Sequence, residues 1–114
     1  MRMRTALAAG VGALALIVTV PTSASAADGA FLYAYSGLDG SDQIAILEDP
    51  ASGDCITLPE VANPSSSSPA RYAYNDTRST AVVFENPDCT GEATALVPHS
   101  GGGESTEFRS VTFS

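Results

Sequence analysis

The sequence predicts an all-β domain made of two copies of one repeat, and three observations support this. From residue 31 onward, apolar residues stand in short runs separated by Gly, Pro, Asn, Asp and Ser, without sustained helical spacing. Two stretches, LEDPASGDCITL at 47–58 and FENPDCTGEATAL at 84–96, can be aligned on their glycines. The chain also contains only two cysteines, which suits a disulfide in a small β-domain.

The repeat has a period of about 38 residues. When Gly53 is aligned with Gly91, an acid, a leucine and an arginine recur at one, five and eighteen residues after the glycine. The matched pairs are Asp54 and Glu92, Leu58 and Leu96, and Arg71 and Arg109. A period of this length indicates one supersecondary unit used twice, with its apolar face buried against its copy.

The N-terminus has the pattern of a secretory signal peptide over residues 1–26. Arg2 and Arg4 precede an uncharged apolar run at 6–20, and the small residues ASA at 24–26 form a cleavage site. The apolar run is shorter than the roughly 20 residues that a membrane-spanning helix needs. We therefore expect cleavage after residue 26 and a secreted, extracellular protein that does not remain in a membrane.

The mature chain is expected to be strongly acidic. Removal of Arg2 and Arg4 leaves three of the five basic residues against 13 acidic ones, so the net charge becomes −10, and the chain has no lysine. Nucleic acids and anionic membranes are poor partners for such a chain, because binding them requires clustered Lys and Arg. A basic partner or a cation suits this field better, and the acidity also favours solubility.

Short strands joined by turns are expected along the whole mature chain. The predicted strands lie at residues 31–35, 43–47, 55–58, 70–74, 80–84, 92–97 and 108–113. The strand at 31–35 lies outside the repeat, so we expect an added strand that pairs at a sheet edge. The connections at 59–69 and 98–107 are polar and lack core residues, so we expect them on the surface, where binding residues are often found.

The predicted organisation is therefore a signal peptide at 1–26, an N-terminal strand and turn at 27–42, and two motifs at 43–79 and 80–114. We expect the mature chain to be one small monomeric domain.

Cys55 and Cys89 are expected to form a disulfide, because an even cysteine count in a small exported domain implies one. The bond would join the first copy to the second. Cys55 follows Gly53 by two residues whereas Cys89 precedes Gly91 by two, so the cysteines occupy different positions of the repeat. The expected stabilisation is roughly 3 to 4 kcal/mol in the loop-entropy description.

The second copy resembles the Greek-key motif of the βγ-crystallin superfamily. In residues 84–91 an aromatic is followed seven residues later by glycine, and RSVTF at 109–113 opens a final strand with the Ser-Val pair of that family. The first copy departs from the pattern, since Leu47 replaces the aromatic and Tyr72 replaces the serine. The resemblance covers about residues 43–114. Within that superfamily, the chain looks most like small exported bacterial proteins, including metalloproteinase inhibitors with a crystallin-like fold. The resemblance implies a sandwich of two Greek-key motifs.

The same resemblance raises the possibility of bound calcium. The run NDTRST at 75–80 looks like the calcium-binding run of many crystallin-like domains, and its oxygen donors suit that ion. In the register of the repeat, however, that run belongs at 67–72 and 105–110, which lack Asn or Asp in the leading positions. We therefore interpret 75–80 as the turn between the copies. The segment DGSD at 39–42 lacks the spacing of an EF-hand and is also interpreted as a turn.

Few residues are suited to catalysis, so no enzyme, cofactor or metal site is expected. His99 is the only histidine, there is no lysine, and no Gly-x-Ser-x-Gly sequence would hold a nucleophile. We interpret His99 as a solvated loop residue. Arg71 and Arg109 open the last strand of their copies, so we expect structural roles for them, either as ion pairs or with stems packed over the sheet edge.

Two functional hypotheses follow from the sequence. The first is a secreted, non-enzymatic module that binds another extracellular protein, in particular as an inhibitor of a protease such as a metalloproteinase. The alternative is a calcium-stabilised structural or stress protein of βγ-crystallin type. Thermal unfolding in EDTA distinguishes them, because a bound calcium ion stabilises the folded state.

Overall fold

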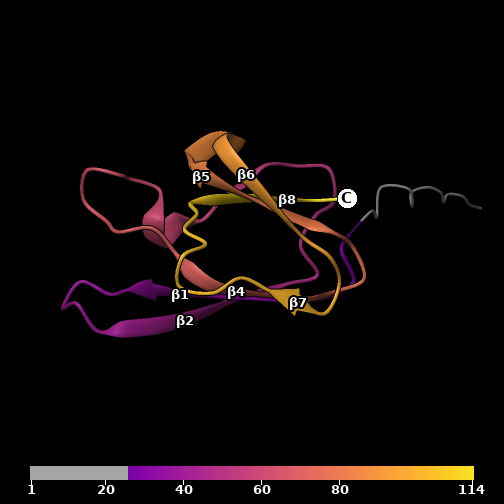
Figure 1. The fold of residues 1–114 in the computed structure, drawn as a ribbon, viewed down its shortest axis with the longest axis horizontal. Coiled ribbons are helices and arrows are strands. Elements are labelled where there is room, and N and C mark those ends of the chain that lie inside the picture. The colour runs from indigo at the N-terminus through magenta and orange to yellow at the C-terminus, as the bar shows by residue number, and fades with distance from the viewer. Residues whose placement is uncertain (1–25) are drawn as a thin grey trace, which may run out of the picture.

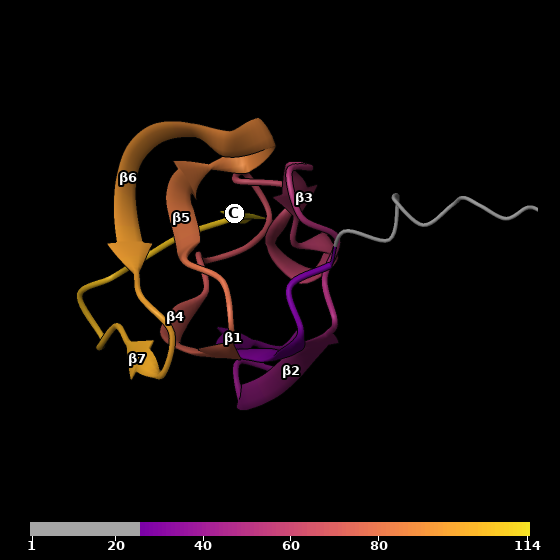
Figure 2. The ribbon, with the colours of Figure 1, turned by 90° about the vertical axis from the view of Figure 1, so that its right-hand side faces the viewer.

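A computed structural model describes residues 26–114 as two four-stranded antiparallel sheets that face each other (Figures 1 and 2). The first sheet contains β1 (Gly29–Ser36), β2 (Asp42–Glu48), β4 (Arg71–Thr77) and β7 (Ser100–Gly101). The second contains β3 (Ile56–Thr57), β5 (Ala81–Asn86), β6 (Thr90–Leu96) and β8 (Ser110–Phe113). Two 3₁₀ turns, η3 (Pro59–Val61) and η4 (Pro87–Cys89), lie in the connections. The predicted all-β class is confirmed, while the predicted signal peptide falls outside the described residues except for Ala26.

The strand order shows how the two halves of the chain are combined. It is β2-β1-β4-β7 in one sheet and β3-β8-β5-β6 in the other. The first half of the chain forms β1 to β4, and the second half forms β5 to β8. Each half places its first, second and fourth strands in one sheet and its third strand in the other sheet. The order β4-β1-β2 is that of a Greek key whose third strand has moved to the facing sheet.

The N-terminal strand is central in its sheet, so the expectation of an edge position is wrong. β1 pairs with β2 on one side and with β4 on the other, and β2 forms the edge. β1 thus has the same place in the first sheet as β5 in the second. The order of strands, rather than local sequence similarity, makes β1 to β4 equivalent to β5 to β8.

This equivalence corrects the register of the predicted repeat. Gly91 is the second residue of β6, directly after the β5–β6 turn, whereas Gly53 lies in the connection between β2 and β3. The counterpart of Gly91 is Gly40, in the turn between β1 and β2, and both have a positive φ, 88° and 84°. Only glycine adopts this conformation without strain. The first half is longer, because 31 residues separate Gly40 from Arg71 and 18 separate Gly91 from Arg109.

The arginine equivalence predicted from the repeat agrees with the structure. Arg71 begins β4, and Arg109 directly precedes β8. The residues before them, Ala70 and Phe108, exchange two backbone hydrogen bonds, at 2.9 and 3.0 Å. The fourth strands of the two halves therefore start from one paired point between the sheets.

Aromatic side chains fill the space between the sheets. Phe31 and Tyr33 alternate with outward-facing residues on β1, and they pack against Phe108 and Phe113 from the second half. Phe31 meets Phe113 edge-to-face, with ring centroids 5.4 Å apart, an arrangement that adds about 1 kcal/mol to the burial of area. Smaller apolar residues complete the core: Leu58, Val61, Val83 and Val111.

Several predicted boundaries also change. The strand expected at 55–58 is limited to β3, and the connection expected at 98–107 contains the short strand β7. The turn expected at 75–80 is partly wrong, because its first three residues belong to β4. Among the described residues, no helix is long and apolar enough to cross a membrane.

Candidate functional site

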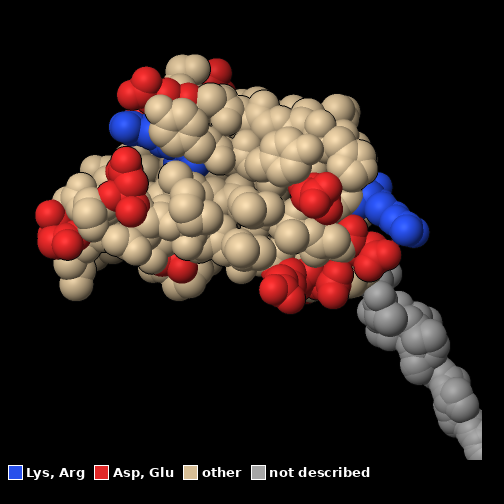
Figure 3. Space-filling view, turned by 90° about the horizontal axis from the view of Figure 1, so that it is seen from below, with Lys and Arg blue, Asp and Glu red and all other residues tan. Residues whose placement is uncertain are grey.

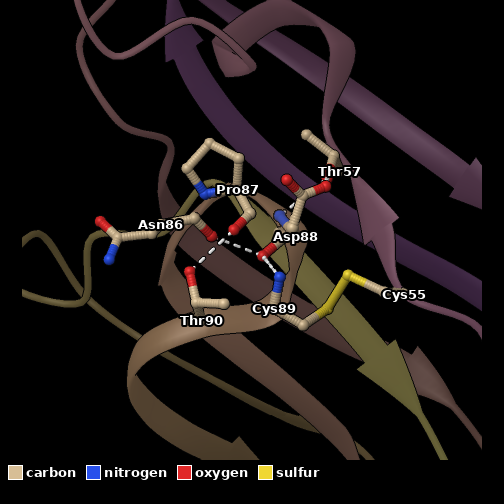
Figure 4. The surroundings of a disulfide bond; sticks show 8 residues. Cys55, Thr57, Asn86, Pro87, Asp88, Cys89 and Thr90 are labelled. Atoms are coloured by element: carbon tan, nitrogen blue, oxygen red, sulfur yellow. Dashed lines mark hydrogen bonds between the residues drawn. A yellow bond between two sulfur atoms is a disulfide. The ribbon is translucent and has the colours of Figure 1, made fainter.

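The disulfide predicted between Cys55 and Cys89 is present, with the two Cα atoms 5.9 Å apart. Cys89 lies in the folded turn between β5 and β6, and Cys55 lies just before β3 (Figure 4). The turn is compact because Asp88 and Cys89 both have positive φ, at 61° and 56°. The bond therefore holds the tip of the β5–β6 hairpin to the other edge of the second sheet.

Polar groups around the disulfide are used to hold this turn. The buried Ser110 hydroxyl accepts a bond from the Cys89 N–H at 2.8 Å and donates to the Asn86 carbonyl at 2.6 Å. The Thr57 hydroxyl accepts a bond from the Asp88 N–H at 3.0 Å. These contacts satisfy the backbone of a strained turn, so we assign the region a structural role.

The run resembling a calcium site is occupied by structural hydrogen bonds. The buried Asn75 amide donates to the carbonyls of Ser79 and Leu96, each at 2.8 Å. Its oxygen accepts bonds from the N–H and the hydroxyl of Thr77, at 3.1 and 2.6 Å. All four bonding positions of the amide are filled. Within residues 26–114, no cluster of three or more His, Cys, Asp or Glu residues is arranged to hold a metal ion.

His99 lies on the surface, as the sequence predicts for a loop residue, but it has a partner that the sequence did not indicate. Its Nδ1 is 3.0 Å from an oxygen of Asp76, and both side chains are more than half exposed. The backbone N–H of His99 donates to the Asn75 carbonyl at 2.7 Å. These contacts attach the β6–β7 connection to β4.

Both arginines hold parts of the fold together, but only Arg71 forms the ion pair that the sequence suggests. Arg71 forms an ion pair with Glu107 at 2.7 Å, and both side chains are partly exposed. Arg109 is buried and is held by hydrogen bonds alone: to the Val61 carbonyl and the Ser67 hydroxyl at 3.0 Å, and to the Ser67 carbonyl at 2.8 Å. A buried guanidinium requires such partners.

Arg109 therefore orders the serine-rich loop at 62–69. The loop also contains its own bonds, since the Asn63 side chain accepts from the N–H and the hydroxyl of Ser65, at 3.0 and 2.7 Å. The Ser67 hydroxyl donates to the Asn63 carbonyl at 2.6 Å. The composition suggests a flexible loop, but these contacts tie it to the core.

The loop at 62–69 lies at the same end of the sandwich as the β1–β2 turn, on the left of Figure 1. The two segments line opposite sides of a shallow groove, which is formed by Gly37, Leu38 and Gly40 together with Pro59, Asn63, Ser66 and Ser67. Leu38, at the tip of the turn, is fully exposed. This end of the molecule thus presents a large apolar side chain beside a polar loop.

Hydrogen bonds close the turn that carries Leu38. The Gly40 N–H donates to the Gly37 carbonyl at 2.9 Å, which closes a β-turn around Leu38 and Asp39. The Asp39 carboxylate accepts bonds from the hydroxyl and the N–H of Ser41, at 2.6 and 3.0 Å. These two bonds favour the ionised carboxylate and so lower the pKa of Asp39.

A second exposed apolar surface lies on the outer face of the first sheet. We call it the apolar strip: Leu32 and Ala34 on β1, Ile44 and Ile46 on β2, and Tyr74 on β4. The strand register places Leu32 between Ile46 and Tyr74, and Ala34 beside Ile44. Figure 3, which views this side, shows uncharged atoms in the middle and acidic atoms mostly along the rim and at the ends.

The sequence predicts only some of these candidate binding surfaces. The serine-rich loop belongs to one of the two connections, 59–69 and 98–107, in which the sequence suggests looking for binding residues, whereas the β1–β2 turn was assigned no function. The exposed Ile44 and Ile46 alternate with the partly buried Ala45 and Leu47, a pattern present in the sequence DQIAILE. The neighbours of this strand had to be known before its free side could be recognised. No protein-family model, no curated protein and no solved structure matches this chain.

Proposed function

We propose that the chain is a secreted, non-enzymatic module that binds another extracellular protein, and that the β1–β2 turn at Leu38 is its main contact. The observation that carries this proposal is the full exposure of Leu38 on a turn fixed by hydrogen bonds. A large apolar side chain that enters a pocket of a partner releases surface from water and acts as an anchor.

The rigidity of this end favours a binding role. Binding by a flexible loop loses affinity because the loop must become ordered, whereas a loop that is already ordered avoids this loss. The Leu38 turn is closed by the backbone bond between Gly37 and Gly40, and the neighbouring loop at 62–69 is held by Arg109. The Leu38 turn and the loop at 62–69 are therefore two fixed segments that flank the shallow groove at one end of a disulfide-linked sandwich.

The more specific version of the proposal is inhibition of an extracellular protease. An apolar side chain that protrudes from the tip of a turn, as Leu38 does, is complementary to the concave, apolar-lined cleft typical of enzyme sites. Residues 84–91 and 109–113 resemble the Greek-key motif of the βγ-crystallin superfamily. Small exported metalloproteinase inhibitors have a fold of that type, so the resemblance supports this version. Leu38 would then occupy an apolar subsite of the protease.

Export and the absence of catalysis are parts of the same proposal. The Cys55–Cys89 disulfide is of the kind that persists in oxidising compartments, and the pattern of residues 1–26 is that of a signal peptide. The sequence provides a single histidine and no lysine as general bases near neutral pH. These features support a role in binding rather than in chemistry.

A panel of extracellular metallo- and serine proteases, assayed with micromolar protein, tests the inhibitor version. We expect at least one protease to be inhibited, and Leu38→Asp to weaken inhibition by about 30-fold or more, which corresponds to loss of an interface anchor. Val97→Asp is the matched control, because Val97 is an exposed apolar residue in the β6–β7 connection.

Both variants should unfold at the temperature of the unmodified protein, since neither residue belongs to the core. If all the proteases remain fully active, the inhibitor version is wrong. A pull-down from the medium of the producing culture then tests the broader proposal, and recovery of no partner that depends on Leu38 would contradict it.

A further inference from the structure

We propose a second binding surface at the free edge of β2. This edge binds an extended segment of another protein, and the segment joins the first sheet as an outer strand. The segment carries a basic residue at each of its ends. β2 is the outermost strand of its sheet, with β1 as its only strand neighbour in the described part of the chain. Its register with β1 runs unbroken over seven residue pairs, from Asp42 to Glu48. The edge is therefore long and regular.

The backbone of an edge strand can pair with a further strand. Alternate N–H and C=O groups of β2 face away from β1, and an added strand satisfies them. Proteins usually protect such edges with proline, lysine, bulges or very short strands. β2 contains neither proline nor lysine, and it extends over seven residues. Backbone hydrogen bonds would supply affinity, and side chains would supply selectivity.

The other long edge, β6, is a poorer candidate. Its register with β5 shifts between Phe84 and Asn86, so its pairing is irregular. Its sequence, TGEATAL, presents Thr and Ala where β2 presents isoleucine. The comparison favours β2 as the strand that accepts a partner.

Side chains on the outer face of β2 define the chemistry of the partner. In order they are Asp42, Ile44, Ile46 and Glu48, and the two isoleucines are 67% and 53% exposed. Opposite charges and apolar pairs stabilise neighbouring strands. A complementary strand therefore carries basic residues opposite the two acids and apolar β-branched residues between them. On the inner face it would also cover the exposed sides of Ala45 and Leu47, which pack against the core.

The charges disfavour a second copy of this chain as the occupant. If two β2 strands paired antiparallel about Ala45, the isoleucines would meet, but Asp42 of each strand would lie opposite Glu48 of the other. Like charges in directly opposed positions destabilise strand pairing. The excess of acidic over basic residues adds to the repulsion between copies and attracts a basic segment.

Two seven-residue peptides test the proposal by NMR titration of the folded, ¹⁵N-labelled protein. The basic peptide is Lys-Thr-Val-Thr-Val-Thr-Lys, and its matched control has Glu in place of both Lys. We expect the basic peptide to shift the amide signals of β2 and to bind about tenfold more tightly than the control. Neutralising the strand with Asp42→Asn and Glu48→Gln should remove most of this difference.

Two further peptides separate strand addition from docking on the face of the sheet. Each is the basic peptide with N-methyl groups on alternate residues, so each blocks one of its two backbone edges. Strand addition requires that one of them loses binding while the other keeps it. The Leu38→Asp variant should bind the basic peptide unchanged, so this proposal and the protease proposal fail independently.

The proposal is wrong if the basic peptide leaves the β2 signals unmoved, if the acidic peptide binds equally well, or if both methylated peptides bind like the parent. Sedimentation provides one more outcome. A dimer that dissociates on Ile44→Thr substitution would show that a second copy occupies the edge, and would also overturn the proposal.

Discussion

The guanidinium group of Arg109 donates two hydrogen bonds to Ser67, one to its carbonyl at 2.8 Å and one to its hydroxyl at 3.0 Å. Arg109 directly precedes β8 in the second sheet, while Ser67 belongs to the loop that lines the groove beside Leu38. A third bond reaches the Val61 carbonyl. One buried side chain therefore connects the candidate binding end to the core.

Replacement of Arg109 by Gln should destabilise the protein by about 2 to 4 kcal/mol, because it leaves the buried carbonyl of Val61 and the partly buried carbonyl of Ser67 without a donor. The same replacement of Arg71, whose ion pair with Glu107 is partly exposed, should have an effect below about 1 kcal/mol. Urea unfolding of both variants measures the difference. If both variants lose the same free energy of unfolding, the burial of Arg109 is not what stabilises the loop.

Removal of the disulfide by the double substitution Cys55→Ser and Cys89→Ser should lower the free energy of unfolding. The bond joins residues 34 apart in sequence, and a closed loop of this size corresponds to roughly 3 to 4 kcal/mol. Hydrogen exchange should increase first in the β5–β6 turn, since Cys89 lies in it. Unfolding midpoints measured with and without reductant on the unmodified protein provide the control, and no difference between them would contradict the prediction.

Alkaline pH should destabilise the protein through Tyr33. Burial, and next the bond that its hydroxyl donates to Glu60 at 2.7 Å, raises the pKa of Tyr33. A phenol whose pKa is higher in the folded state contributes fully to the stability of the protein at a pH below its unfolded pKa, which is about 10. This contribution is lost as the pH rises further. Urea unfolding from about pH 8 to about pH 11 should show a shallower decline for Tyr33→Phe than for the unmodified protein.

Tyr72→Phe is the matched control for this experiment, because Tyr72 is an exposed tyrosine on β4. It should keep the full alkaline decline. If Tyr33→Phe and Tyr72→Phe show the same slope, burial of the Tyr33 phenol is not its cause.

Acid pH should loosen the turn that carries Leu38. The hydroxyl bond from Ser41, and next its N–H bond, lowers the pKa of Asp39. These bonds therefore hold the turn fully at a pH above the pKa of an unfolded aspartate, which is about 4. They are lost as the pH falls through the lower pKa that Asp39 has in the folded state. An NMR titration should show the Ser41 amide signal moving at a lower pH than a free aspartate would give. Ser41→Ala should move that transition upward, whereas Ser36→Ala, at the exposed end of β1, should not.

Calcium should not stabilise the folded protein. The Asn75 amide already makes four hydrogen bonds, so we expect the same unfolding temperature in EDTA and in millimolar calcium. Asn75→Asp places carboxylate oxygens against the carbonyls of Ser79 and Leu96, which should destabilise the fold by about 2 to 4 kcal/mol. Calcium should not restore this loss. A rise in unfolding temperature on adding calcium to either protein would contradict the prediction.

Local features of the fold could be predicted from the sequence. The disulfide followed from the cysteine count, and the short apolar runs indicated strands close to those observed. The ion pair of Arg71 and the surface position of His99 also agreed. Each of these depends on nearby residues or on general properties of small disulfide-containing domains.

Strand pairing could not be predicted in the same way, because it depends on contacts between distant residues. The alignment of Gly53 with Gly91 matched Arg71 to Arg109 correctly but misplaced everything before them, since the first half has longer connections. A better signal was present: an aromatic precedes glycine by seven residues at Tyr33 and Gly40, as it does before Gly91. That spacing marks the first turn of each half.

The exchange of third strands between the sheets has a consequence for the order of events during synthesis. The first sheet is incomplete without β7, and the second is incomplete without β8, which ends at Phe113. Neither sheet can therefore be completed during synthesis before the residues of β7 and β8 have emerged from the ribosome. The two halves should therefore fold together as one cooperative unit rather than one after the other.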